Sequence, residues 1–206
     1  KINQFHKAKE SLERYIKINN KNVITHYYLG MIYENILDTK NAIKHYNEVR
    51  KIDTHFSDSN LQLGMILYNN QKYQKAVEPL RDYIVQNPDS LGVLEIFADV
   101  LWNEKRYPEA IDAYKRLYES KNSKIDYLVN IADAYIELND MLNAKEILTK
   151  IILLGNVNAD IVFTLAKIEA GLEDYNNAIT HFLMATQMGN PTIDMYYSLA
   201  MVYAEL

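Results

Sequence analysis

Apolar residues recur along this chain at intervals of three and four, which is the spacing that places them on one face of an α-helix. The pattern itself repeats every 34 residues. Two columns of small residues mark the repeat without an insertion: Gly30, Gly64, Ala98, Ala132, Ala166 and Ala200, and then Ala8, Ala42, Ala76, Ala110, Ala144 and Ala178. Each 34-residue unit therefore predicts two amphipathic helices joined by a short turn.

The small residues predict where the two helices of a unit touch. Helices approach closely only where a side chain is Gly or Ala, and larger residues nearby fill the grooves. A column of such larger residues follows four positions after the second small column: Leu12, Tyr46, Leu80, Tyr114, Leu148 and Phe182. We expect an all-α stack of antiparallel helix hairpins, with all twelve small residues at hairpin contacts.

The pattern resembles the tetratricopeptide repeat family, whose motif matches Leu29-Gly30-x-x-Tyr33 with Ala42-x-x-x-Tyr46, and Leu63-Gly64 with Ala76-x-x-x-Leu80 and Pro88. The resemblance covers residues 1–206 as one domain. It divides them into five full repeats and two half repeats: 23–56, 57–90, 91–124, 125–158 and 159–192, with 1–22 and 193–206 at the ends. It implies an α-solenoid that curls into a right-handed superhelix, with the first helix of each repeat lining a concave groove.

The groove should be lined by the side of each first helix that lies opposite the hairpin contact. The candidate binding residues are Tyr27, Met31, Leu61, Met65, Tyr68, Glu95, Asp99, Trp102, Asp133, Phe163, Lys167 and Tyr197. Exposed aromatic residues beside acids suit a protein or peptide segment that carries basic and apolar residues. The alternative is that these residues pack on neighbouring repeats and bind nothing.

The sequence offers little chemistry beyond binding. Its net charge of −5 argues against a dedicated nucleic-acid binder, and the chain has no cysteine. The histidines lack the spacing of metal ligands, and the glycines form no phosphate-binding loop. His45 and His181 share a repeat column, so we expect them far apart on the outer surface. We expect no catalytic residue, metal or cofactor. Glu169 departs from a column of Tyr and Leu, so we expect it in a shifted or solvent-edge position; it would be a perturbed acid if it were buried.

These patterns favour a non-catalytic scaffold for protein–protein interaction within a larger repeat protein or complex. One alternative is the substrate-selecting repeat region of an enzyme whose catalytic domain lies outside this sequence; another is RNA binding, which the acidic groove and the 34-residue period disfavour. The chain does not begin with Met, so we expect it to be part of a longer protein. No apolar run is long enough to span a bilayer, which makes the cytoplasm the default compartment and leaves the periplasm open. We also predict self-association through the two repeat ends.

Overall fold

A computed structural model of the chain describes residues 2–120, 124–189 and 191–205, and all the regular secondary structure in these ranges is α-helical. The helices follow the predicted order of two per repeat: α1 (Ile2–Ile18), α2 (Val23–Asn35), α3 (Thr39–Ile52), α4 (Ser57–Asn69), α5 (Tyr73–Gln86), α6 (Leu91–Asn103), α7 (Tyr107–Glu119), α8 (Ile125–Glu137), α9 (Met141–Leu153), α10 (Ala159–Gly171), α11 (Tyr175–Gln187) and α12 (Ile193–Glu205). The prediction of an all-α solenoid of helix hairpins is confirmed.

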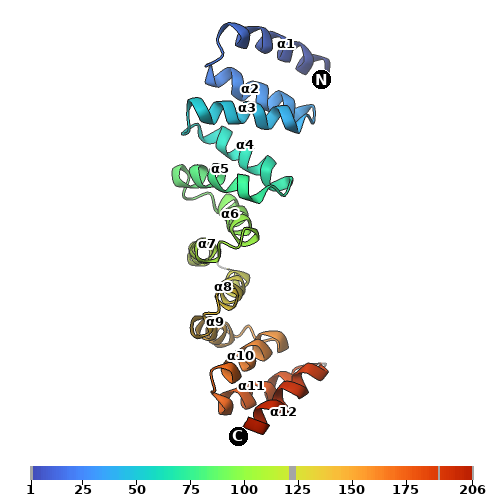
Figure 1. The fold of residues 1–206 in the computed structure, drawn as a ribbon, viewed down its shortest axis with the longest axis vertical. Coiled ribbons are helices and arrows are strands. Elements are labelled where there is room, and N and C mark those ends of the chain that lie inside the picture. The colour runs from blue at the N-terminus through green and yellow to red at the C-terminus, as the bar shows by residue number, and fades with distance from the viewer. Residues whose placement is uncertain (1, 121–123, 190, 206) are drawn as a thin grey trace. The chain divides into compact units, whose positions relative to one another are not determined.

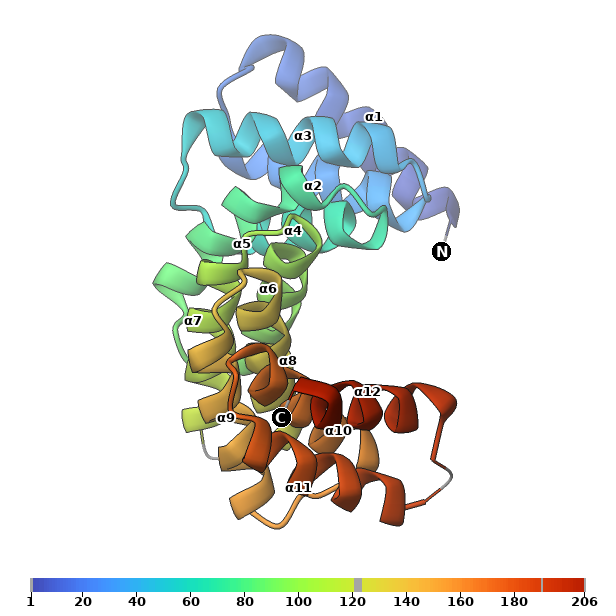
Figure 2. The same cartoon turned by 60° about the horizontal axis from the view of Figure 1, so that its bottom comes forward.

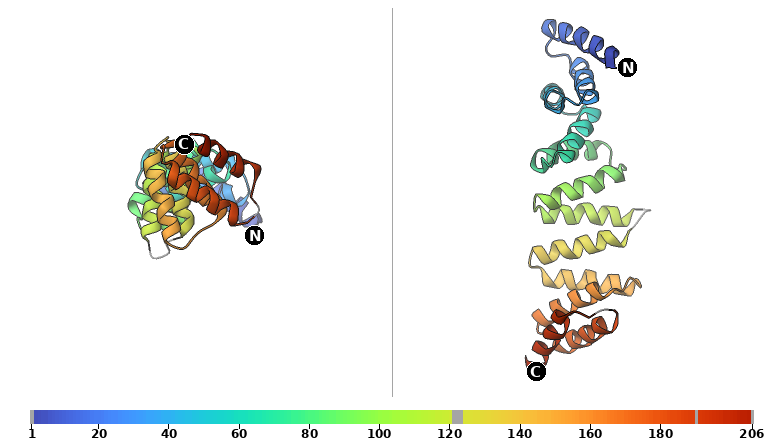
Figure 3. Two further views of the ribbon diagram at one scale, coloured as in Figure 1. Left: turned by 90° about the horizontal axis from the view of Figure 1, so that it is seen from below. Right: turned by 90° about the vertical axis from the view of Figure 1, so that its right-hand side faces the viewer.

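The helices form two compact units, Lys1–Glu104 with α1–α6 and Lys105–Leu206 with α7–α12. In unit 1 each helix packs against the next, and α2 lies between α1 and α3 (Figure 1). In the view of Figure 2, α3 crosses in front of α2. In unit 2 the same order makes successive rungs, visible from α7 (yellow-green) to α9 (orange) in the right-hand view of Figure 3. The boundary falls between the two helices of repeat 91–124, and the single domain 1–206 stays a prediction.

The two small-residue columns lie at the hairpin contacts inside the array. Ten of the twelve small residues are buried, and a Cβ built on Gly30 would lie 2.5 Å from the Tyr46 ring. A Cβ on Gly64 would meet Leu80 at the same distance. The expectation is wrong for Ala8 and Ala200, which are exposed because α1 and α12 each lack the other helix of their hairpin. Self-association through these ends stays a prediction.

The turn inside each full repeat has one residue in the left-handed backbone region. These residues are 34 positions apart: Leu37 (φ 61°), Gln71 (55°), Lys105 (56°), Asn139 (57°) and Glu173 (61°). None is glycine, so composition gave no sign of this conformation. The left-handed residue therefore recurs at the same position of each full repeat.

Polar side chains fix where several helices begin. Asn22 accepts a hydrogen bond from the Thr25 backbone N–H at 2.8 Å at the start of α2, and Asn158 accepts one from Ile161 at 2.9 Å at the start of α10. Asp38 does the same for α3. These caps satisfy N–H groups that have no partner within the first helical turn.

Substituting Ala for Gly30 tests this packing directly. We expect a loss of about 1–2 kcal/mol in the free energy of unfolding, because the clash with buried Tyr46 outweighs the better helix propensity of Ala. Gly92 is the matched control, because it is also helical but a Cβ there meets nothing within 4 Å. Guanidinium melts that show equal stability for Gly30→Ala and Gly92→Ala would contradict the hairpin contact.

Candidate binding surfaces

Eight of the predicted binding residues lie in unit 1, on the first helices α2, α4 and α6. We call this set the unit 1 face: Tyr27, Met31, Leu61, Met65, Tyr68, Glu95, Asp99 and Trp102. Every one of them is half-buried. Each of these side chains is therefore covered in part by neighbouring residues, and the rest of it remains open to solvent.

A hydrogen bond links two of the first helices across this face. The Tyr68 hydroxyl donates to the Asp99 carboxylate, and the Tyr68 ring packs against Tyr73 with centroids 6.0 Å apart. Burial and the Asp99 charge raise the pKa of Tyr68, so the hydroxyl keeps its proton and remains a donor. This hydrogen bond places the Asp99 carboxylate beside Tyr68 on the unit 1 face.

Tyr27 is fixed by an aromatic cluster at the other end of the face. Its ring centroid lies 5.0 Å from that of Phe56 in the turn before α4, and 6.2 Å from that of buried Tyr46. The Tyr46 hydroxyl donates to Glu34 at 2.9 Å. The sequence placed Tyr27 on the face but gave no sign that Phe56 supports it, since Phe56 lies in a connection outside the two helical patterns.

The other four predicted residues lie in unit 2, and the structure brings only two of them together. Lys167 is exposed with its Nζ 5.4 Å from the centre of the half-buried Phe163 ring. Both line an open pocket of about 560 Å³ between the α8–α9 turn and α10, together with Ile136, Asn139, Met141, Thr164, Ile168 and Gly171. Asp133 is exposed and does not line this pocket, and Tyr197 is 63% exposed on α12.

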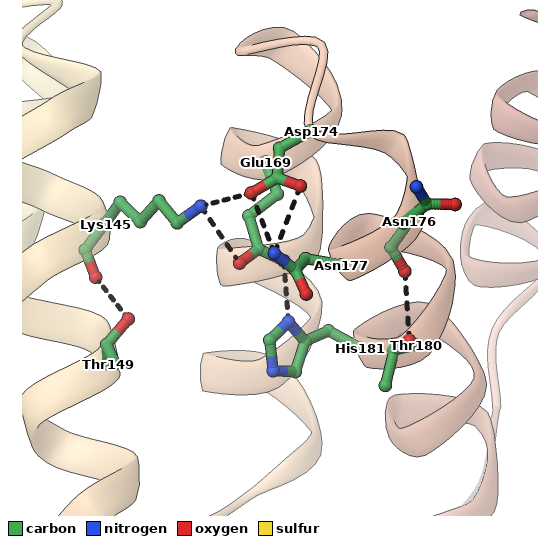
Figure 4. Close-up of polar contacts among 8 residues, drawn as sticks. All are labelled: Lys145, Thr149, Glu169, Asp174, Asn176, Asn177, Thr180 and His181. Carbon is green, nitrogen blue, oxygen red and sulfur yellow. Dashed lines mark hydrogen bonds and ion pairs between the residues drawn. The ribbon is translucent and has the colours of Figure 1, made fainter.

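Glu169 is buried, so the expectation of a shifted or solvent-edge position is wrong. Its side chain is 3% exposed, and its two carboxylate oxygens contact Lys145 Nζ at 3.4 Å and the His181 Nδ1 at 2.6 Å (Figure 4). Lys145 also donates to Asp174 at 2.6 Å, and Asn177 donates to Asp174 at 2.9 Å. Glu169 therefore joins α10 to α9 and α11 through polar contacts with two half-buried side chains.

Unit 1 has the same arrangement with a different central residue. Lys9, Tyr33 and His45 stand 136 residues before Lys145, Glu169 and His181, which is four repeats. Lys9 Nζ lies 5.6 Å from the centre of the Tyr33 ring, which stacks on His45 with centroids 5.3 Å apart. Both sites therefore place a cation and an imidazole around one buried side chain, and we read both as contacts that hold neighbouring helices together.

His45 is buried, so the expectation that it lies on the outer surface is wrong. His45 Nδ1 and His26 Nδ1 are 2.9 Å apart between α2 and α3, and His26 Nε2 lies 3.0 Å from the backbone oxygen of Asn20. Because a carbonyl only accepts, Nε2–H of His26 donates to it, and a neutral His26 accepts from His45. Burial, with His26 and Lys44 adding to it, lowers the pKa of His45 to about 4.

This histidine pair predicts a loss of stability in acid. The unfolded chain takes up a proton on His45 near its ordinary pKa of about 6.5, whereas the folded chain resists it down to about pH 4, so stability falls as the pH falls through this window. Guanidinium unfolding at pH 7 and pH 5 measures how much of the free energy of unfolding is lost in acid. This loss should be about 1–2 kcal/mol smaller in His45→Gln than in the parent. His55→Gln, at an exposed histidine, is the control. Identical losses in all three proteins would contradict the assignment.

Within residues 2–120, 124–189 and 191–205, no group of three or more His, Cys, Asp or Glu side chains is placed to hold a metal ion. Across the same ranges, no helix has the length and apolar character needed to cross a membrane.

Comparisons with known proteins agree with this fold. Residues 35–117 match the family model described as anaphase-promoting complex, cyclosome, subunit 3, and residues 125–154 match a tetratricopeptide repeat model. The chain belongs to the tetratricopeptide repeat family. Such repeats are typically interaction modules without catalytic activity of their own. No curated protein matches this tetratricopeptide repeat chain in sequence.

Solved structures show the same fold at low sequence identity. The structure "Naa15/Naa10 bound to HypK-THB" matches with a TM-score of 0.75 and 14% identity, over 98% of this tetratricopeptide repeat chain and 32% of the other, so this chain spans about a third of that one. YrrB, described as "a TPR protein with an unusual peptide-binding site", matches with a TM-score of 0.60 and 13% identity over 96% of this chain and all of the other (100%). MamA matches with a TM-score of 0.56 and 20% identity, over 78% and 94%.

Proposed function

We propose that this protein is a non-catalytic scaffold that binds a segment of a partner protein on the first helices of its repeats, as part of a larger repeat protein or complex. The observation that carries the proposal is the unit 1 face, where aromatic and methionine side chains stand half-exposed beside Glu95 and Asp99. Aromatic anchors of this kind supply most of the affinity of many interfaces, and methionine adapts to irregular partners.

The charge of the unit 1 face defines the partner segment. Its only ionisable side chains apart from tyrosine are Glu95 and Asp99, and both are acidic. A Lys or Arg next to a bulky apolar residue would pair with these carboxylates while the apolar side chain covers Met65 or Trp102. The peptide-binding site named for YrrB supports a peptide ligand for this fold, and the basic and apolar character of the partner follows from the residues of this chain.

The experiment uses an array of 12-residue peptides in three classes: basic (Lys or Arg), acidic (Asp or Glu) and neutral. Every peptide also carries Phe, Leu, Ile, Met or Trp, at varied spacings from the charged residue in the first two classes. We expect basic–apolar peptides to bind, and the strongest of them is then measured in solution at several salt concentrations. Asp99→Asn should slow association several-fold and flatten the salt dependence, because the carboxylate attracts the basic segment at long range.

Asp89→Asn is the control for that experiment, because Asp89 is an exposed acid in the turn after α5 and is not a residue of the unit 1 face. It should leave the association rate and its salt dependence unchanged. Binding of neutral and basic peptides with equal affinity, or an unchanged salt dependence in Asp99→Asn, would contradict the proposed partner.

A further inference from the structure

The pocket in unit 2 differs in charge from the unit 1 face. Its lining residues come from the end of α8, the α8–α9 turn and α10, and Lys167 is the only ionisable side chain among them. The remaining lining is mostly apolar, with Phe163, Ile136, Met141 and Ile168. At about 560 Å³ the pocket lies within the range of about 300–1,000 Å³ in which proteins bind small ligands or single side chains of a partner.

The Lys167 ammonium group is placed for a ligand that carries a negative charge. It is exposed, it lies over the Phe163 ring, and the structure shows no carboxylate paired with it among the described residues. Neither of the two nearby acids on α8 is paired with Lys167. Asp133 is outside the pocket lining, and Glu137 accepts a hydrogen bond from the Tyr107 hydroxyl at 3.0 Å. The Lys145 ammonium, by contrast, is already held by Asp174 and Glu169.

We propose that this pocket binds an acidic side chain next to a bulky apolar one, on a partner protein. The apolar side chain enters between Phe163, Met141 and Ile168, and the neighbouring carboxylate pairs with Lys167. Asn139 and Thr164 supply polar groups at the same pocket. This inference rests on the proposed interaction function and adds to it, because it means that the two units select partner segments of opposite charge.

Gly171 offers a way to close the pocket without disturbing the fold. It lines the pocket at the last position of α10, and a Cβ built on it meets nothing within 4 Å. A leucine there adds apolar volume to the pocket and improves the helix propensity of the position. Lys167→Gln removes the charge while keeping most of the side-chain length.

Lys150 provides the matched control for Lys167. Its Nζ lies 4.7 Å from the centre of the Tyr118 ring, much as Lys167 lies over Phe163, but Lys150 is on α9 and outside the pocket. Lys150→Gln therefore removes one exposed lysine with a similar aromatic contact from the same unit. Circular dichroism and melting temperature of each variant check that the fold is intact.

The test measures the strongest acidic–apolar peptide of the array, labelled with fluorescein, by fluorescence anisotropy. We expect Lys167→Gln to weaken binding at least five-fold, Gly171→Leu at least ten-fold, and Lys150→Gln not at all. Unchanged affinity in folded Gly171→Leu, or an array in which no acidic–apolar peptide binds, overturns the inference. If basic–apolar peptides still bind in a Trp102-dependent way, the proposed function survives that result; if no peptide of any class binds, both fail.

Discussion

Replacing Lys145 by Val is expected to lower the free energy of unfolding by about 3 kcal/mol. Glu169 would keep its buried carboxylate, 3% exposed, with His181 as its remaining side-chain partner. Removing the cation beside a buried carboxylate is costly because the carboxylate then stays out of water with less compensation. Equilibrium unfolding in guanidinium at pH 7.5 measures the loss.

The chain itself supplies the compensating substitution. Two repeats earlier, the positions equivalent to Lys145, Glu169 and His181 hold Val77, Leu101 and Ala113, all buried. The triple variant Lys145→Val, Glu169→Leu, His181→Ala copies that apolar set, and we expect it to recover most of the stability lost in Lys145→Val. A triple variant that is no more stable than the single one would show that the cost does not arise from the unpaired Glu169 carboxylate.

The repeats were predictable because both helices of every unit obey the same packing rule. A small residue opposite a large one is visible in the sequence at a fixed spacing, and Gly30 opposite Tyr46 shows the rule in the structure. The same rule failed at Ala8 and Ala200, where the other helix of the hairpin is missing and does not cover the small residue. Residue type predicts which surface can be buried, but burial also requires a neighbour.

The polar contacts within the hairpins were not predictable from residue spacing alone. His45 and His181 share a column, and spacing suggested the outer surface for both. The structure instead places them beside Tyr33 and Glu169, whose side chains turn toward the second helix of the same hairpin. Such a site can be recognised only by comparing columns of different helices. Lys9, Tyr33 and His45 lie on three helices, and no one of them alone indicates the contact.

The residues of the unit 1 face are half-buried in the structure, and their use as a binding surface remains our proposal. Helical periodicity decides which side of a helix is available, so it could place Trp102 and Tyr68 on α6 and α4. It could not reveal that the Tyr68 hydroxyl bonds to Asp99, nor that the α8–α9 turn and α10 enclose a pocket around Lys167. Those features depend on how turns place neighbouring repeats.

Trp102→Ala is the second substitution for which we expect a large effect, in this case on affinity. Trp102 is the only tryptophan, it is half-buried on α6, and a tryptophan in the centre of an interface excludes water over a large area. Its loss should weaken binding of the strongest basic–apolar peptide by about 2 kcal/mol, which is roughly 30-fold in the dissociation constant. Tyr15→Ala, at an exposed aromatic residue of α1, should leave binding unchanged.

Isothermal titration calorimetry of that peptide against the parent chain and Trp102→Ala is the most direct test of the claim that the first helices bind a partner. We predict a roughly 30-fold weaker dissociation constant for Trp102→Ala, with the helical circular dichroism spectrum and the melting temperature of the variant preserved. A folded Trp102→Ala protein that binds the peptide as tightly as the parent would contradict the proposal and place the binding surface elsewhere on the repeats.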